Sequence, residues 1–389
     1  MARPQLDVLF FPISLRFQTN READLFSYLL PRLGRTAPLL APSAQKDMLL
    51  EALQTPLPEG RTRLVILDGI DEASGWSADA VLFPSAPPAG LRIVVSARAR
   101  QNQSWRDRLG WTGPRLAKVL SLAPLTRAEV FDTAAQILHP KGIVADAAAL
   151  DRLFTLSEGE PFVLWLILTE VIETGGSALR EGLTAQTIPG LGAYVDRWLR
   201  EQETLWQEQR HTSNLALVRS FLYLLACAKG PLTSDDLAEL AERDLAAAPN
   251  LRSAALEALH RLVVRDAAGG YSLAHVHLNW YIRDQQMTRD ERNTVARRFK
   301  EWTLRALAEV EQGERSPEEA PAYLLRFAAE HLDEGRASPE AWEMLLGARW
   351  WSAWRAQGDA LDLDYLRFVL GVRELLASRT CTSVAPAEC

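Results

Sequence analysis

The sequence predicts a mixed architecture, with an α/β domain first and mainly helical domains after it. Up to residue 124, three short apolar runs alternate with helical patterns, which favours a mostly parallel sheet. From Leu125 to about Leu376, apolar residues recur at helical spacing, with one short hairpin between them. We expect four domains, at residues 1–124, 125–205, 206–290 and 291–389.

The composition indicates a folded protein without a membrane span. Of 389 residues, 48% are hydrophobic and 24% are charged, which is typical of globular domains. No run approaches the ~18 apolar residues of a transmembrane helix, and the first residues lack the features of a secretion signal. The net charge of −7 argues against nucleic acid as the main partner. The three cysteines lack metal-ligand spacing, so a reducing cytoplasm is expected.

The first domain is expected to contain three strands and two helices. The strands are expected at residues 7–17, 63–67 and 91–98, and the helices are expected to end near Pro31 and Leu53. Thr19 or Asn20 is expected to cap the first helix.

The second expected strand runs directly into three carboxylates, Asp68, Asp71 and Glu72, in the run D-G-I-D-E. The carboxyl ends of parallel strands face the ligand crevice of an α/β sheet. Hard carboxylate oxygens at that edge suit Mg²⁺ shared with phosphates, and a second acid can orient a water molecule. The structural alternative is an acidic helix start after a buried strand, which the helix dipole favours.

The later domains are predicted from helix and turn signals. Thr126 and Glu129 form an expected capping box, and Gly159–Pro161 separates two helices. After residue 206, three helices precede a hairpin around Gly269, which is a winged-helix layout. Modules of this kind bind DNA, but the third helix carries few basic residues, which favours packing within the chain. In the last domain, aromatic residues at helical spacing are expected to form the core; they include Trp302, Tyr323, Phe327, Trp342, Trp350, Trp351, Trp354, Tyr365 and Phe368.

Four of these stretches stand in an order that resembles the STAND class of P-loop ATPases, the branch that includes NACHT and NB-ARC proteins. Asp68–Glu72 resembles the NACHT-type Walker B motif, and Val94–Arg98 resembles the sensor strand of that class. Gly159–Pro161 is similar to the G-x-P motif, and Tyr271–His275 is similar to the winged-helix segment that ends in a histidine. The resemblance covers about residues 5–375.

The resemblance implies a fold and a function. The fold would be a truncated parallel-sheet P-loop or AAA-like domain, a helical lid, a winged-helix domain and a carboxyl-terminal helical domain. Residues 321–375 look like the helical connector of bacterial members. The function would be that of a signalling switch that binds ATP or ADP with Mg²⁺, hydrolyses ATP and acts in the cytoplasm in bacterial defence.

The resemblance also implies roles for six residues. Asp68 would bind Mg²⁺, Asp71 or Glu72 would orient the attacking water, and Arg98 would reach the terminal phosphate. Pro161 would lie near the adenine, and His275 would contact the β-phosphate of ADP in the closed state.

The sequence departs from this class at one essential motif, because it contains no G-x-x-x-x-G-K-S/T phosphate-binding loop. We therefore expect the chain to start just after the helix of that loop and to bind triphosphate weakly. The expected partners are an oligomer of its own kind or missing upstream and downstream domains. Two alternatives remain, a non-enzymatic interaction scaffold with a dead nucleotide site and a winged-helix DNA-binding regulator.

Overall fold

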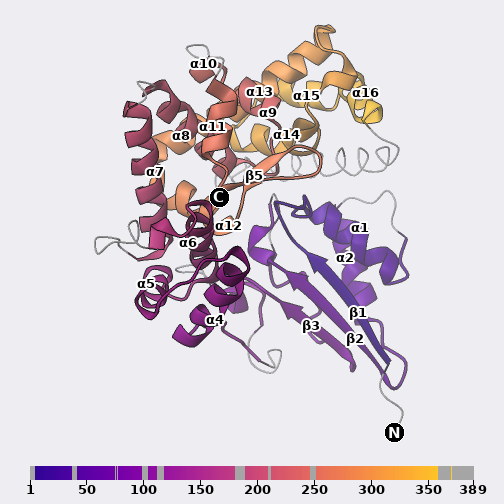
Figure 1. Cartoon of the computed structure of the whole chain (residues 1–389). Coiled ribbons are helices and arrows are strands. Elements are labelled where there is room, and N and C mark those ends of the chain that lie inside the picture. Colours follow the sequence, from indigo (N-terminus) through magenta and orange to yellow (C-terminus); the bar gives the residue numbers. More distant parts are fainter. Residues whose placement is uncertain are drawn as a thin grey trace, which may run out of the picture. The chain divides into compact units, whose positions relative to one another are not determined.

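The computed structural model describes residues 5–36, 42–98 without 75 and 77, 104–111, 118–179, 189–208, 212–245, 251–357 and 369. The chain divides into two compact units, and Figure 1 labels their helices and strands. The first comprises Met1–Val119, Lys229–Pro231 and Ala296–Cys389, and the second comprises Leu120–Ala228 and Leu232–Val295. The four expected domain ranges remain a prediction.

The first unit contains a sheet of three parallel strands in the order β1 (Gln5–Pro12), β2 (Arg61–Asp68) and β3 (Leu91–Val95). The register pairs Pro12 with Asp68 and Leu67 with Val95, so the strands end at a common edge. The predicted parallel sheet is confirmed. The strand expected at 7–17 is too long, because the Thr19 hydroxyl donates to the Pro12 carbonyl at 2.6 Å and closes a loop over residues 13–19.

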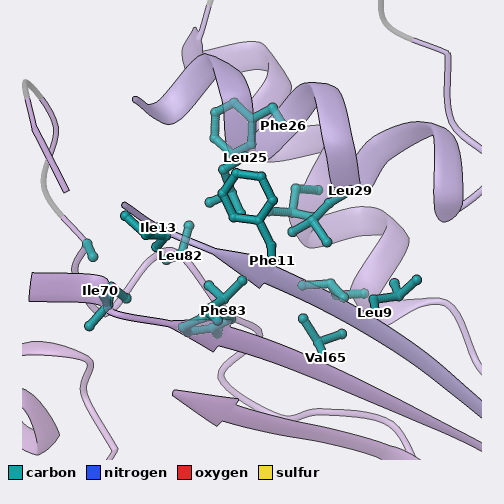
Figure 2. Close-up of a cluster of buried hydrophobic side chains, with 14 of the residues drawn as sticks. Leu9, Phe11, Ile13, Leu25, Phe26, Leu29, Val65, Ile70, Leu82 and Phe83 are labelled. Atoms are coloured by element: carbon teal, nitrogen blue, oxygen red, sulfur yellow. The ribbon is translucent and has the colours of Figure 1, made fainter. Parts of the chain in front are cut away.

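Two helices, α1 (Glu22–Arg32) and α2 (Pro42–Gln54), cover one face of this sheet. Successive strand residues point to opposite faces, so alternate apolar side chains reach the helices. Figure 2 shows this core; it includes Leu9, Phe11, Leu25, Phe26, Leu29 and Val65. The opposite face is apolar as well, and four of its side chains are between 47% and 60% exposed, namely Leu6, Val8, Phe10 and Val94.

The expected cap of α1 is wrong. Arg21 occupies the N-cap position, and no side chain there accepts a hydrogen bond from the first turn. The two residues expected to cap this helix are used elsewhere, since Thr19 closes the loop after β1 and the Asn20 amide donates to the carbonyl of Lys229 at 3.2 Å.

The remaining described helices of the first unit lie mainly near its carboxyl-terminal end. They are α3 (Trp105–Arg108), α13 (Arg289–Gln312, of which residues from 296 belong to this unit), α14 (Ala322–Glu334), α15 (Pro339–Leu345) and α16 (Ala348–Ala356), with a 3₁₀ turn at Pro317–Glu319. The expected aromatic core is confirmed for Trp302, Tyr323, Phe327, Trp342, Trp350 and Trp354, whereas Trp351 is exposed. Tyr365 and Phe368 lie outside the described residues.

The second unit is mainly helical. Its helices are α4 (Arg127–Leu138), α5 (Ala147–Ser157), α6 (Pro161–Glu173), α7 (Gly190–Glu208), α8 (Thr212–Cys227), α9 (Ser234–Leu240), α10 (Glu242–Leu245), α11 (Arg252–Ala258) and α12 (Val276–Trp280). Its described residues also include a 3₁₀ turn at His139–Lys141, a π-helix at Tyr281–Gln286 and the start of α13. The expected capping box of Thr126 and Glu129 is present at the start of α4.

The expected hairpin is also present, as the antiparallel strands β4 (Val263–Arg265) and β5 (Tyr271–Leu273). Leu232 adds a single bridge to Tyr271, so the hairpin is tied to the segment before α9. Helices α8, α9 and α11 precede it in the predicted order. Within the described part of the chain, no helix combines the length and the apolar character that crossing a membrane requires.

Candidate site at the carboxyl edge of the parallel sheet

Asp68 is the last residue of β2, and the chain turns sharply after it. Gly69 has a φ of +78°, and a Cβ there would lie 2.8 Å from the carbonyl oxygen of Ile13. Only glycine fits such a position without strain. Ile70–Glu72 then form a 3₁₀ turn whose Ile70 side chain is fully buried in the core (Figure 2). The turn therefore presents Asp71 and Glu72 at the sheet edge from a rigid base.

Asp68 is exposed and interacts with the end of β3. The Ser96 hydroxyl donates to Asp68 Oδ1, and the backbone N–H of Gly69 donates to Ser96 Oγ at 2.8 Å. Because the backbone N–H of Gly69 fixes the hydroxyl, the hydroxyl in turn orients the carboxylate. An oriented, exposed carboxylate beside a hydroxyl fits Mg²⁺, which keeps most of its ligands as water and phosphate oxygen.

Asp71 and Glu72 both contact Arg98. Its guanidinium lies 3.1 Å from Asp71 Oδ2 and 3.2 Å from Glu72 Oε1, and its backbone N–H donates to Asp71 Oδ1. Glu72 Oε2 accepts from the backbone N–H of Leu15 at 3.1 Å. The side chains of Asp71 and Glu72 are only 3% and 12% exposed, so Arg98 is the counter-charge of two buried carboxylates.

Burial raises the pKa of the Glu72 carboxyl group above its ordinary value. The Leu15 N–H and the Arg98 charge act in the opposite direction, and the neighbouring Asp71 charge adds to the increase. An acid whose pKa is shifted toward neutrality is a better proton acceptor at physiological pH than an ordinary glutamate.

The segment after Glu72 is held by Asn20. The carbonyl of Asn20 accepts from the backbone N–H of Ser74 at 3.0 Å and from the indole N–H of Trp76 at 2.9 Å. Sequence reasoning missed the contributions of Asn20 and Leu15. The loop after β1 carries no motif, and its polar residues Thr19 and Asn20 predict helix caps.

In the second unit, Pro161 is the first residue of α6, a position that its fixed φ and missing N–H suit. Glu160 caps the helix by accepting from the backbone N–H of Val163 at 2.6 Å. Gly159 has a φ of +72°, and a Cβ there would lie 2.2 Å from the Leu125 carbonyl oxygen. The local structure therefore explains why each of the three residues of the G-x-P motif occurs at its position.

His275 lies beside the start of α6. Its ring stacks on Phe162, with centroids 4.3 Å apart, and its Nδ1 accepts from the backbone N–H of His277 at 3.2 Å. His277 Nδ1 lies 3.6 Å from Glu160 Oε1. Burial pushes the pKa of Glu160 upward, but the interactions with His277, the Val163 N–H and His275 outweigh it and keep the pKa below its ordinary value.

The structure thus brings Asp68, Asp71, Glu72 and Arg98 together at one edge in the first unit. Pro161 and His275 are neighbours, through Phe162, in the second unit. Among the residues that the structure describes, no three His, Cys, Asp or Glu side chains are grouped as metal ligands. The predicted metal role therefore depends on Asp68 together with ligands from water and substrate, and the role of each predicted residue stays a prediction.

Neither a scan against protein-family models nor a search of curated proteins gives a match for this chain. Among solved structures, the chain is similar to the Walker-type ATPase PABY2304 of Pyrococcus abyssi, with 14% identity, 71% of this chain and 84% of that chain covered, and a TM-score of 0.27. The RuvB Holliday junction branch migration motor of Thermotoga maritima gives 13% identity, coverage of 71% and 86%, and a TM-score of 0.25. The DNA clamp loader delta protein of Bacillus subtilis is 10% identical, with 98% of this chain and 91% of that chain covered and a TM-score of 0.19. Because all three TM-scores are low, these similarities establish neither a common fold nor a common activity.

Proposed function

We propose that this chain is part of a nucleotide-dependent signalling switch of the STAND type, in which Mg²⁺ and the terminal phosphates of ATP bind at the carboxyl edge of β2 and β3. The observation that carries the proposal is the grouping of three acids and one arginine on two adjacent strand ends. An edge of this kind is where α/β sheets bind their ligands. ATP would favour an open, associating state, and ADP would favour a closed state through His275.

In this proposal, each side chain at the edge has a distinct role. Asp68, oriented by Ser96, would hold Mg²⁺, which would neutralise phosphate charge. Glu72, with its raised pKa, would orient the attacking water. Arg98 contacts both Asp71 and Glu72, so a γ-phosphate must compete with these two acids for its guanidinium. That competition would couple phosphate binding to the position of the acidic turn.

The test is titration of the purified chain with a fluorescent ATP analogue, with and without Mg²⁺. Because the chain lacks a G-x-x-x-x-G-K-S/T loop, we expect weak binding, and Asp68→Asn should remove its Mg²⁺-dependent part. Asp79→Asn is the matched control, because Asp79 is a partly exposed aspartate of the same unit whose carboxylate pairs with Lys46. Mg²⁺-dependent binding that survives Asp68→Asn, or no binding at millimolar nucleotide, would refute the proposal.

A second candidate is a non-enzymatic scaffold with a dead nucleotide site. Two observations favour it, namely the engagement of Asp71 and Glu72 by Arg98 and the exposed apolar face of the sheet. The same titration separates the two candidates, because sub-millimolar nucleotide binding argues against a dead site.

The charges around the third helix of the winged-helix layout argue against a DNA-binding regulator. Arg252 pairs with Asp235 at 2.8 Å, and Arg261 pairs with Glu173 and lies 3.8 Å from Glu170. Paired arginines offer little net charge to a phosphate backbone. We expect no measurable duplex binding at low salt.

A further inference from the structure

A short stretch of chain, Lys229–Pro231, belongs to the first unit, whereas the residues on both sides of it belong to the second. The chain therefore enters the first unit and leaves it again within three residues. We call this stretch the crossover tripeptide. The two segments of the second unit, Leu120–Ala228 and Leu232–Val295, are both joined to this tripeptide. Residues that bind the tripeptide therefore fix the point where both segments are attached.

Two polar side chains hold the backbone of the crossover tripeptide. The Asn20 amide donates to the Lys229 carbonyl at 3.2 Å, and the Lys229 backbone N–H donates to the Tyr323 hydroxyl at 3.0 Å. The Lys229 ammonium group also pairs with Glu334 on α14. The tripeptide is thus bound by side chains from the β1–α1 loop and from α14.

The ring of Phe327 closes over the middle of the tripeptide. A Cβ on Gly230 would lie 2.6 Å from Phe327 Cε2, which is closer than van der Waals contact allows. Gly230 therefore allows the backbone to lie directly on the aromatic ring. This contact needs no charge and no ligand.

The Tyr323 hydroxyl has two partners, since it also lies 2.8 Å from His331 Nε2. Burial lowers the pKa of His331 to about 3, so its ring is neutral at physiological pH. With Nε2 as an acceptor, the Tyr323 O–H donates to His331 while its oxygen accepts from Lys229. Both hydrogen bonds are satisfied together, which fixes the hydroxyl in place.

Asn20 connects this arrangement to the acidic turn. Asn20 is 0% exposed; its side chain binds Lys229, and its backbone carbonyl binds Ser74 and Trp76, in the segment that follows Glu72. The amide is oriented unambiguously, because only its N–H can donate to the Lys229 carbonyl. One residue therefore has hydrogen bonds to both segments.

We propose that Asn20 is a coupling residue, which transmits displacements between the acidic turn at Ile70–Glu72, followed by Ser74, and the crossover tripeptide to which the second unit is attached. The physical basis is a continuous chain of hydrogen bonds from Ser74 through Asn20 and Lys229 to Tyr323. The coupling needs no nucleotide, so it can hold whether or not the proposed function does.

Amide hydrogen exchange, resolved to single residues in the full chain, tests this coupling. Tyr323→Phe removes one hydroxyl, so the Lys229 amide loses its acceptor. We expect faster exchange at Lys229 and also at Ser74, on the order of fivefold, which corresponds to one lost hydrogen bond. Gly230→Ala, which pushes the tripeptide away from Phe327, should accelerate exchange at the same two amides.

The decisive comparison uses Asn20→Ala. In that background, adding Tyr323→Phe should accelerate Lys229 but leave Ser74 unchanged, because the connection is already broken. Tyr28→Phe is the matched control; it removes the same atom in the same unit, from a ring that stacks on Arg32, and should leave both amides unchanged. An unchanged Ser74 in Tyr323→Phe and Gly230→Ala, or an equal effect of Tyr28→Phe, would overturn the proposal.

Discussion

Glu330 on α14 places a titrating carboxyl group beside the crossover tripeptide. Burial raises its pKa to about 7, against the charges of Lys229 and Arg21, while Glu334 and Asp24 raise it further. Among the residues that the structure describes, its buried Oε2 has no hydrogen-bond partner. Near neutral pH, this carboxyl group changes between a neutral form that tolerates burial and a charged form that does not.

The sign of the pH dependence follows from this shift. The pKa of Glu330 is raised from 4.5 to about 7 in the folded state. The stability that depends on the protonated carboxyl group is therefore fully present below pH 4.5, and it is lost as the pH rises through 7. Glu330→Gln keeps the neutral form at every pH. The unfolding free energy of this variant minus that of the native chain should therefore be about 3 kcal/mol larger at pH 8 than at pH 4. Chemical denaturation at both pH values measures this difference, and an equal difference at both would contradict it.

Individual site residues were predictable from the sequence where they are adjacent in it, and not where their partners are far away in the chain. Asp68, Asp71 and Glu72 were found because they are adjacent in a short run after an apolar strand. The pairing of Arg98 with Asp71 spans 27 residues and depends on the register of β2 and β3, which no local pattern contains. Asn20 was assigned to the wrong role for the same reason, because its partner Lys229 is 209 residues away.

At the scale of elements, the strands and most helix starts were predictable, and the ends of elements were less so. The capping box at Thr126 and the hairpin β4–β5 depend on local chemistry and are confirmed. The end of β1 depends on a side chain in the following loop, and its position was wrong. Local signals thus fix where an element begins more reliably than how far it extends.

The glycine of the G-x-P element offers a test of whether local packing accounts for it. Gly159 and Gly142 have nearly the same φ, +72° and +71°, but a Cβ would strike the Leu125 carbonyl at 2.2 Å in the first and meet nothing within 4 Å in the second. Gly142→Ala should cost about 1 kcal/mol for its left-handed backbone. Gly159→Ala should cost at least about 2 kcal/mol more, because its backbone must also move.

Chemical denaturation of the two variants in the absence of nucleotide measures this difference. If both substitutions lower the unfolding free energy by the same amount, the packing of Gly159 against Leu125 would not explain why glycine occurs at position 159.

At the largest scale, the sheet of the first unit has one face covered by α1 and α2 and an opposite face that carries exposed apolar side chains. Parallel sheets in soluble proteins are normally covered on both faces. Here Leu6, Val8, Phe10 and Val94 share the face opposite to α1 and α2, and all four are between 47% and 60% exposed. Contiguous exposed apolar side chains promote association.

We expect the purified chain to self-associate through this face. Val8→Lys and Val94→Lys place charges on it without touching the covered core, so they should shift the sedimentation profile toward the monomer with little loss of unfolding free energy. Phe17→Lys is the matched control, because Phe17 is 65% exposed but lies beyond the end of β1. If all three variants associate like the native chain, another surface drives the association. If Phe17→Lys alone produces monomers, the loop after β1, and not the sheet face, makes the contact.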